Sequence, residues 1–196
     1  MKNDILAGQA GIEEVQRLLD AGLAVMHRYG TSRSPRVADI VAEADLSNDA
    51  FYRHFAGKDE LVAAILDAGT ARLLGYLAHQ MGKVDDPAEK VRRWIEGIMA
   101  QTFMPAVAEA TRAILWNAAR VSDDTRRRGS ARRPLAELLE GPVAQLGSTD
   151  PARDALLISY ACMTRMDEFL WAREAPSADD MEHLVAFSLR AAGDRG

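Results

Sequence analysis

Residues 34–61 read SPRVADIVAEADLSNDAFYRHFAGKDEL, and this stretch decides the fold. Ser34 is suited to capping the free amide groups at a helix start, and Pro35 fits the first helical position, where its missing N–H costs nothing. Apolar residues then recur at three- and four-residue steps and mark one buried face. The sequence predicts a helix of roughly ten residues here, followed by a tight turn at Asp45 and Leu46.

A second short helix is predicted directly after the turn. Ser47 is placed to cap it, and Asp49 lies in its first turn, where the helix dipole favours an anion. Phe51 and Phe55 are four residues apart and form its core-facing side. Gly57 then breaks the chain before a longer helix begins.

Polar side chains gather on the outward face of this second helix, namely Asn48, Asp49, Tyr52 and Arg53, with His54 nearer its edge. Asn can bond adenine and Arg can bond guanine in bidentate fashion, and Tyr and His can reach phosphate oxygens. The starts of the three helices add further candidate phosphate contacts, at Ser34, Arg36, Ser47 and Lys58. We interpret the stretch as a helix-turn-helix whose second helix reads a DNA major groove.

The same residues fill the fixed positions of a known pattern, S-x-x-x-[FL]-Y-x-H-F-x-x-K-[DE]-x-L, with Ser47, Phe51, Tyr52, His54, Phe55, Lys58, Asp59 and Leu61. Together with the preceding VADIVAEA helix, this resembles the tetracycline-repressor-type (TetR) family of bacterial transcription regulators over residues 12–66. The turn of that family usually has a glycine where this chain has Asp45, and Asp is among the few other residues that tolerate a left-handed conformation.

The resemblance implies a homodimeric, all-helical repressor with a three-helix DNA-binding domain and a C-terminal domain that binds a small molecule and dimerises. It also implies that Tyr52, His54 and Lys58 contact phosphates, while Asn48, Asp49 and Arg53 lie near base edges. The N-terminal arm, often basic in such proteins, offers only Lys2 here.

The rest of the chain also follows helical spacing, without strand-like alternation. We therefore expect an all-α fold of about nine helices. We place the domain boundary at Gly57, which gives a helix-turn-helix domain over 1–57 and a ligand-binding and dimerisation domain over 58–196. The other predicted helices cover residues 12–26, 58–80, 85–103, 106–119, a segment ending near 146, 151–173 and 178–192.

Composition and charge limit the partners of the protein. The formal net charge is −5, which argues against strong non-specific binding of nucleic acid. Within residues 27–58, five basic side chains face four acidic ones, so any basic footprint is small and local. There is no apolar run of transmembrane length and no signal-peptide pattern, so we expect a soluble, cytoplasmic protein without a membrane partner. Cys162, the single cysteine, lies in an apolar pattern and is expected to be a buried thiol.

The second domain is rich in large, soft side chains. Four of them are candidates for lining a pocket for an apolar or aromatic molecule: Trp94, Phe103, Trp116 and Tyr160. Plain core packing is the competing interpretation of each position. The last two helices are apolar on more than one side, which predicts pairing with a second subunit and two reading helices on a palindromic DNA site.

Three alternatives remain from the sequence alone. The helix pair could be purely structural, the protein could bind a ligand without binding DNA, or the aromatic cavity could serve an enzyme. No catalytic set, Gly-rich phosphate loop or paired metal-ligand spacing is present, so we expect no enzyme activity, cofactor or metal site. The arginine-rich segment from Ser122 to Arg133 could be a second anion site or a solvated loop.

Overall fold

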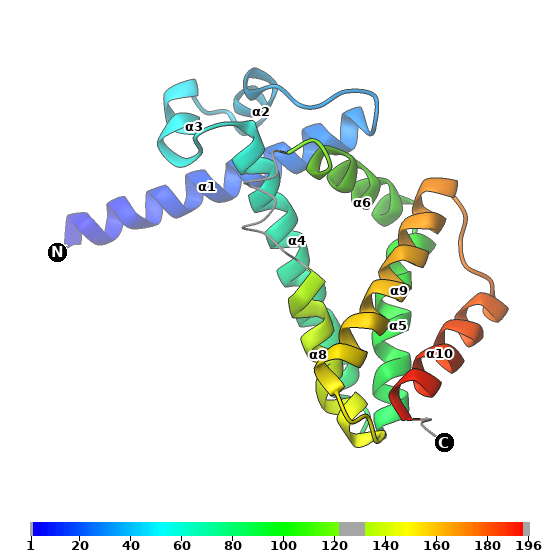
Figure 1. Ribbon diagram of the computed structural model, residues 1–196. Helices are drawn as coiled ribbons and strands as arrows, with labels where there is room; N and C mark the ends of the chain where they lie inside the picture. The colour runs from blue at the N-terminus through cyan, green and yellow to red at the C-terminus, as the bar shows by residue number, and fades with distance from the viewer. Residues whose placement is uncertain (1, 122–131, 194–196) are drawn as a thin grey trace. The chain divides into compact units, whose positions relative to one another are not determined.

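A computed structural model describes residues 2–121 and 132–193, which form nine α-helices and no strand (Figure 1). This confirms the all-α prediction over the described residues. The arginine-rich segment falls almost wholly outside them. The helices are α1 (Lys2–Tyr29), α2 (Val37–Ala44), α3 (Asn48–His54), α4 (Lys58–Met81), α5 (Pro87–Phe103), α6 (Pro105–Ala118), α8 (Arg132–Gln145), α9 (Pro151–Ala172) and α10 (Ala178–Gly193).

The chain forms two compact units. The first, here called the helix-turn-helix unit, comprises the described residues of 1–68 and 109–129. The second, here called the bundle unit, comprises those of 69–108 and 130–196. Helix α9 packs against α5, α8 and α10 in the bundle unit, as Figure 1 shows. Helices α4 and α6 each contribute residues to both units.

The core of the helix-turn-helix unit draws on α1, α2, α3, α4 and α6. Its fully buried side chains include Leu18 and Met26 of α1, Ile40 of α2, Phe51 of α3 and Leu61 of α4. A glycine lets α1 and α4 approach closely, because a Cβ at Gly22 would lie 2.8 Å from both Leu61 Cδ2 and Ile65 Cδ1. The apolar spacing around 34–61 therefore predicted the buried face of each short helix correctly.

The first helix is longer than its apolar pattern predicted. It begins at Lys2, ten residues before the expected start, and ends at Tyr29. Gly30 then takes a left-handed φ of 55° and donates its N–H to Met26 O at 2.8 Å, as the sequence led us to expect. Ile12 was expected on the buried stripe and is instead 71% exposed, because the stripe continues past the neighbouring helices toward the N-terminus.

The second helix starts two residues later than predicted. Helix α2 begins at Val37, so Pro35 is not its first residue and Ser34 does not cap it. The position before the helix is Arg36, whose backbone N–H donates to Asp39 Oδ2 at 3.1 Å. Asp39, in the first turn of the helix, supplies the carboxylate acceptor for this N–H. Asp39 thus has the capping role that the sequence analysis gave to Ser34.

The bundle unit has its own apolar core. Trp94, Ile95 and Ile98 of α5, Leu139 of α8 and Ile158 of α9 are fully buried. The α5 helix begins as predicted, with Pro87 in its first turn and Asp86 Oδ2 accepting the Glu89 N–H at 2.9 Å. Cys162 is buried, as expected; burial raises the pKa of its thiol to about 11, a rise that the contact with Ser188 partly offsets.

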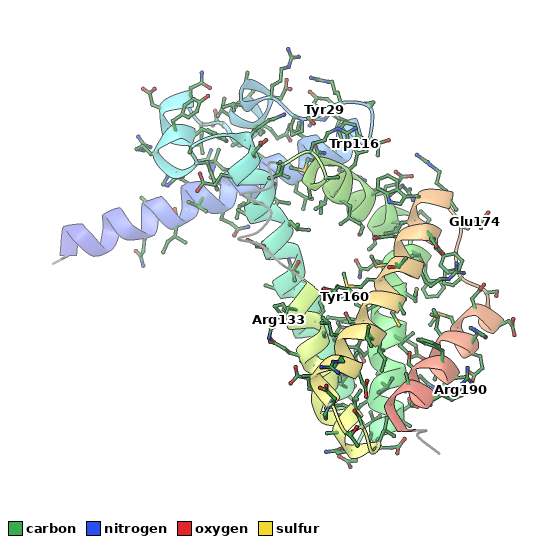
Figure 2. All side chains as sticks on the ribbon, in the orientation of Figure 1. Tyr29, Trp116, Arg133, Tyr160, Glu174 and Arg190 are labelled. Carbon is green, nitrogen blue, oxygen red and sulfur yellow. The ribbon has the colours of Figure 1, made fainter. Side chains whose placement is uncertain are left out.

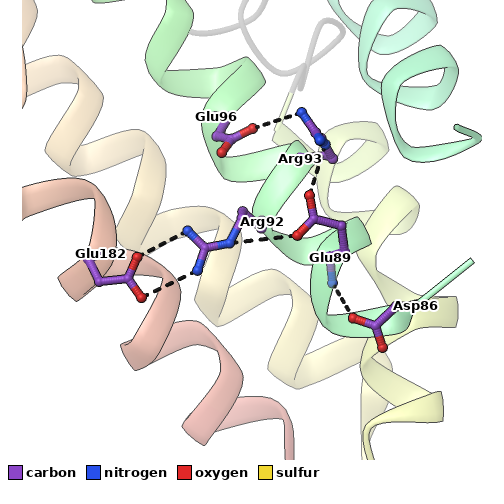
Figure 3. Close-up of polar contacts among 6 residues, drawn as sticks. All are labelled: Asp86, Glu89, Arg92, Arg93, Glu96 and Glu182. Atoms are coloured by element: carbon purple, nitrogen blue, oxygen red, sulfur yellow. Dashed lines mark hydrogen bonds and ion pairs between the residues drawn. The ribbon is translucent and has the colours of Figure 1, made fainter. Parts of the chain in front are cut away.

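A network of ion pairs joins α5 to α10 on the surface of the bundle unit (Figure 3). Arg92 extends both guanidinium Nη atoms to Glu182, at 3.1 and 3.3 Å, and its Nε lies 3.8 Å from Glu89. Arg93 also contacts Glu89, and it reaches Glu96 one turn further along. The network ties α10 to the helix that carries the buried Trp94.

One described helix, α4, is long and apolar enough to pass a length-and-composition test for a membrane span, with a mean hydropathy of 1.4. Asp67 and Arg72 interrupt its apolar sequence. Its first turns bury Leu61 and Val62 in the core of the helix-turn-helix unit, which fits a connecting helix.

Candidate DNA-binding site

The turn between α2 and α3 depends on a single left-handed residue. Asp45 has φ 51° and ψ 50°, the conformation that the sequence led us to expect at this position. The next residue, Leu46, donates its N–H to Val41 O at 2.9 Å and so closes the end of α2. From α1, Arg17 Nη2 donates to the carbonyl oxygens of Ala44 and Asp45 at 2.5 and 3.0 Å. The turn is thereby fastened to α1.

Helix α3 is oriented by a cap and by its aromatic side. The Ser47 hydroxyl accepts the Ala50 N–H at 3.1 Å, as its position in the sequence predicted. Phe51 is fully buried and Phe55 nearly so, with ring centroids 5.7 Å apart. Tyr52 meets Phe51 edge to face at 5.3 Å, which positions the phenol ring while its side chain stays 58% exposed.

The outward face of α3 carries the expected polar groups. Asn48, Asp49 and Tyr52 are all exposed, and so is Lys58 at the start of α4. Asn48 and Tyr52 are four residues apart, which places them on one side of the helix. The face offers amide, carboxylate, phenol and ammonium groups to a partner.

Two other candidates, Arg53 and His54, are bound to a residue of α1. Arg53 Nη2 donates to both carboxylate oxygens of Glu14 at 3.0 Å, and His54 Nε2 lies 2.8 Å from Glu14 Oε2. These bonds, that of His54 foremost, hold the pKa of the Glu14 carboxyl below its ordinary value of 4.5. Sequence reasoning missed Glu14, because no local pattern links a residue of α1 with one that lies 40 positions later.

The entry to α2 holds two of the basic side chains near one carboxylate. Asp39 Oδ2 is 3.2 Å from Arg33 Nη1 and 3.5 Å from Arg36 Nε. The Arg36 backbone N–H bond and these two charges keep the pKa of Asp39 below 3.8. Arg33 also lies over the Tyr29 ring, 3.6 Å from its centroid. Ser34 is half-buried beside this cluster, and Arg36 is exposed.

Each arginine of residues 9–57 lies within 4.0 Å of a carboxylate in this unit. Besides the pairs above, Arg28 Nη2 lies 2.5 Å from Glu43 Oε2, and Arg17 Nη2 lies 4.0 Å from Asp45 Oδ2. The local charge is therefore balanced as well as small. An anionic partner must compete with these carboxylates for the guanidinium groups.

The four candidate ligand residues lie in different environments. Trp94 is fully buried, and its indole N–H donates to Leu135 O at 3.0 Å, which makes it a satisfied core residue. Phe103 and Tyr160 are 46% and 42% exposed. Trp116 belongs to the helix-turn-helix unit, with Arg120 stacked 3.4 Å from its ring centroid.

Apolar side chains are exposed along one stripe of α9. Leu157, Tyr160 and Trp171 are 59%, 42% and 48% exposed, and Phe187 of α10 is 43% exposed. The α9 residues are separated by three and eleven positions, spacings that recur on one side of a helix. Figure 2 labels the Tyr160 side chain on α9. Sequence analysis had predicted that α9 would be apolar on a second side.

Comparison with known proteins supports the fold. Residues 18–65 match the family model described as bacterial regulatory proteins, tetR family, which covers the helix-turn-helix stretch. A search of curated proteins finds no match to this sequence.

Solved structures resemble almost the whole chain. Reduced NemR of E. coli is 14% identical, with a TM-score of 0.66 over 89% of this chain and 95% of that one. A TetR-family transcriptional regulator of Pectobacterium atrosepticum is 23% identical, with a TM-score of 0.63 over 93% and 92%. SmeT, the repressor of the Stenotrophomonas maltophilia multidrug efflux pump SmeDEF, is 20% identical, with a TM-score of 0.61 over 91% and 87%. Residues 18–65 thus match the tetR family of bacterial regulatory proteins, and the fold over most of the chain is like that of solved regulators named for the TetR family.

Proposed function

We propose that this protein is a ligand-responsive transcriptional repressor that binds a palindromic DNA operator as a dimer. The observation that carries the proposal is the outward face of α3, where Asn48, Asp49 and Tyr52 are exposed on a helix that Ser47 caps and Phe51 anchors. A short, rigidly held helix with polar groups on its free side suits a major groove.

Each polar group has a role in this proposal. Tyr52, His54 and Lys58 contact phosphates, and Asn48, Asp49 and Arg53 lie near base edges. Backbone amides at the helix starts, with Ser34, Arg36 and Ser47, add phosphate contacts that fix the register of the protein on the duplex. The DNA-binding function resides in residues 1–57, and ligand binding and dimerisation reside in residues 58–196.

Dimerisation occurs through α9 and α10 in this proposal. The stripe of Leu157, Tyr160 and Trp171, extended by Phe187, is an apolar surface that a second copy would bury. A two-fold axis through these helices brings the same stripe onto itself and presents two reading helices to successive major grooves.

The effector is a small apolar or aromatic molecule bound in the C-terminal domain. Its binding favours a dimer whose reading helices are spaced wrongly for DNA, with α4 as the connecting lever. A hundredfold loss of operator affinity requires a preference of about 2.7 kcal/mol for the non-binding state. Because the Trp94 ring is already packed and bonded, and Tyr160 lies on the proposed dimer stripe, the exposed Phe103 is the better probe of ligand contact.

A gel-shift titration tests the central claim. Wild-type protein and a Tyr52→Ala/Lys58→Ala variant are titrated against duplexes tiled across the DNA that flanks its own gene. We expect the wild type to shift at least one duplex and the double variant to lose most of that affinity. Equal binding by both proteins at every salt concentration would overturn the assignment of α3.

A helical protein that binds a small molecule but not DNA is the second candidate. The observation in its favour is that each arginine of residues 9–57 already lies near a carboxylate. Absence of any salt-dependent DNA affinity in the same titration would support it.

A further inference from the structure

The carboxylate of Glu14 lies where it can compete with DNA for the basic side chains of α3. It receives Arg53 Nη2 on both oxygens at 3.0 Å and His54 Nε2 on one oxygen at 2.8 Å. Both partners sit at the C-terminal end of the helix that we propose reads DNA. A third element, α1, therefore holds two of its candidate contacts.

Arg53 is bound to this carboxylate without being buried. Its side chain remains 59% exposed, while those of Glu14 and His54 are 27% and 18% exposed. Asp49 lies one turn before Arg53, on the same side of α3, and is exposed. The Arg53 guanidinium therefore lies at the surface beside the outward face of α3, and its bonds to Glu14 direct it toward α1.

Helix α1 also passes beside His54 at Gly11. A Cβ at Gly11 would lie 3.9 Å from His54 Cε1, an ordinary contact distance, one turn of α1 before Glu14. The bonds from Arg53 and His54 therefore join α3 to a stretch of α1 that already lies beside it.

We infer that Glu14 is an affinity-limiting residue of the DNA-binding site, which withholds Arg53 from DNA phosphates. This inference rests on the proposed function, and it names the device that limits phosphate binding at that site. Both Glu14 oxygens accept from the same Arg53 nitrogen at 3.0 Å, and the anionic oxygens of a phosphate group are charge-assisted acceptors of the same kind. Release of Arg53 adds one cation to the phosphate-binding set.

Salt dependence is the measurement that counts such cations. For duplex DNA, the slope of log affinity against log salt becomes steeper by about 0.9 for each phosphate that the protein neutralises. Glu14→Gln keeps the side-chain shape and removes the charge. Binding to a mixed-sequence duplex is measured by fluorescence anisotropy across a salt series at one fixed pH.

The chain offers a matched control. Glu13 is exposed and adjacent, so Glu13→Gln changes the net charge by the same amount without touching Arg53. We expect Glu14→Gln to steepen the slope by about 0.9 and Glu13→Gln to leave it unchanged. The double variant Glu14→Gln/Arg53→Gln should return to the wild-type slope. Equal slopes for the two single variants, or a shallower slope for Glu14→Gln, would overturn the inference.

Two further measurements keep the result decisive. Arg53→Gln alone is measured on the same mixed-sequence duplex: a slope shallower than that of the wild type by about 0.9 would mean that Arg53 already binds phosphate, which contradicts the inference even where Glu14→Gln fails to fold. On a heparin column, Glu14→Gln should elute at higher salt than Glu13→Gln. If that order holds and no variant binds any duplex, the proposed function fails, and the heparin result shows only that Glu14 withholds Arg53 from a polyanion. If duplex binding depends on Tyr52 and Lys58 but Glu14→Gln behaves as Glu13→Gln, only the inference fails.

Discussion

Arg17 of α1 donates through Nη2 to the carbonyl oxygen of Ala44, the last residue of α2, at a distance of 2.5 Å. The same nitrogen also reaches Asp45 O at 3.0 Å, so one guanidinium satisfies two carbonyls at the turn. A cation at a helix C-terminus also interacts favourably with the helix dipole.

Replacing Arg17 by Gln should destabilise the helix-turn-helix unit. The side chain is half exposed, so the expected loss is about 1 kcal/mol in the free energy of unfolding. Urea denaturation followed by circular dichroism measures it. Arg190→Gln, at an exposed position near the end of α10, is the control and should lie within about 0.5 kcal/mol of the wild type. Equal effects of the two substitutions would show that the Arg17 bonds add nothing to stability.

Gly97 of α5 should not tolerate a methyl group. A Cβ there would lie 2.3 Å from Leu77 Cδ2 and 3.3 Å from Tyr76 Cε1, and Leu77 is fully buried. We expect Gly97→Ala to cost about 1–3 kcal/mol, because overpacking forces buried side chains off their preferred rotamers.

The neighbouring Gly75 of α4 provides the opposite case. A Cβ at this position meets nothing within 4 Å, so Gly75→Ala should stabilise the protein by about 0.5–1 kcal/mol through helix propensity. Thermal unfolding of both variants checks the pair. If both substitutions moved the melting temperature in the same direction, the result would contradict the close packing of α5 on the end of α4 described here.

Leu157 tests the proposed dimer. It is 59% exposed on the apolar stripe of α9, and an aspartate at this position would place a charge within the proposed contact. We expect Leu157→Asp to elute as a monomer in size-exclusion chromatography with light scattering. Ala152→Asp adds the same charge on another side of α9 and should leave the dimer intact. A dimeric Leu157→Asp protein would exclude this stripe as the interface.

Asp39 should make the stability of the protein sensitive to acid. Its pKa is lowered in the folded protein, chiefly by the backbone N–H of Arg36, so the unfolded chain takes up its proton at a higher pH than the folded chain does. The stabilisation is therefore fully present above the ordinary pKa of 3.8 and is lost as the pH falls through the lower, folded value.

Asp39→Asn removes this contribution. Denaturation midpoints measured from pH 7 down to about pH 3 should fall less steeply for the variant than for the wild type. Parallel curves would indicate that the Arg36 contact does not stabilise the ionised carboxylate.

Local spacing predicted much of the fold. Ser47 could be recognised as a cap, and Phe51 and Phe55 as core, because a helix places residues three and four positions apart on one side. Asp45 could be expected to adopt a left-handed conformation, since few other residues do so at low cost. Each of these inferences required only the geometry of one element.

Contacts between distant residues could not be predicted in this way. The pairing of Arg53 and His54 with Glu14 spans about 40 residues, and the bond from Trp94 to Leu135 O spans 41. The start of α2 was misplaced because Asp39 and Ser34 are both good capping residues, and only the folded chain selects between them. Ile12 was misassigned because it continues the apolar stripe of α1 beyond the core of the helix-turn-helix unit, so the side chain is exposed.

Helix α1 holds the two shorter helices in position through three of its side chains. Glu14, Arg17 and Arg28 are three and eleven positions apart, so they lie along one side of α1 over about 21 Å, and they bind α3, the turn and α2 respectively. A helix of seven residues such as α3 is too short to persist alone in water. The orientation of α3 therefore depends on its contacts with α1. Inserting one residue between Glu14 and Arg28 would rotate these two side chains by about 100° relative to one another around the α1 axis. The insertion would misalign α3 without altering any residue on the surface of α3.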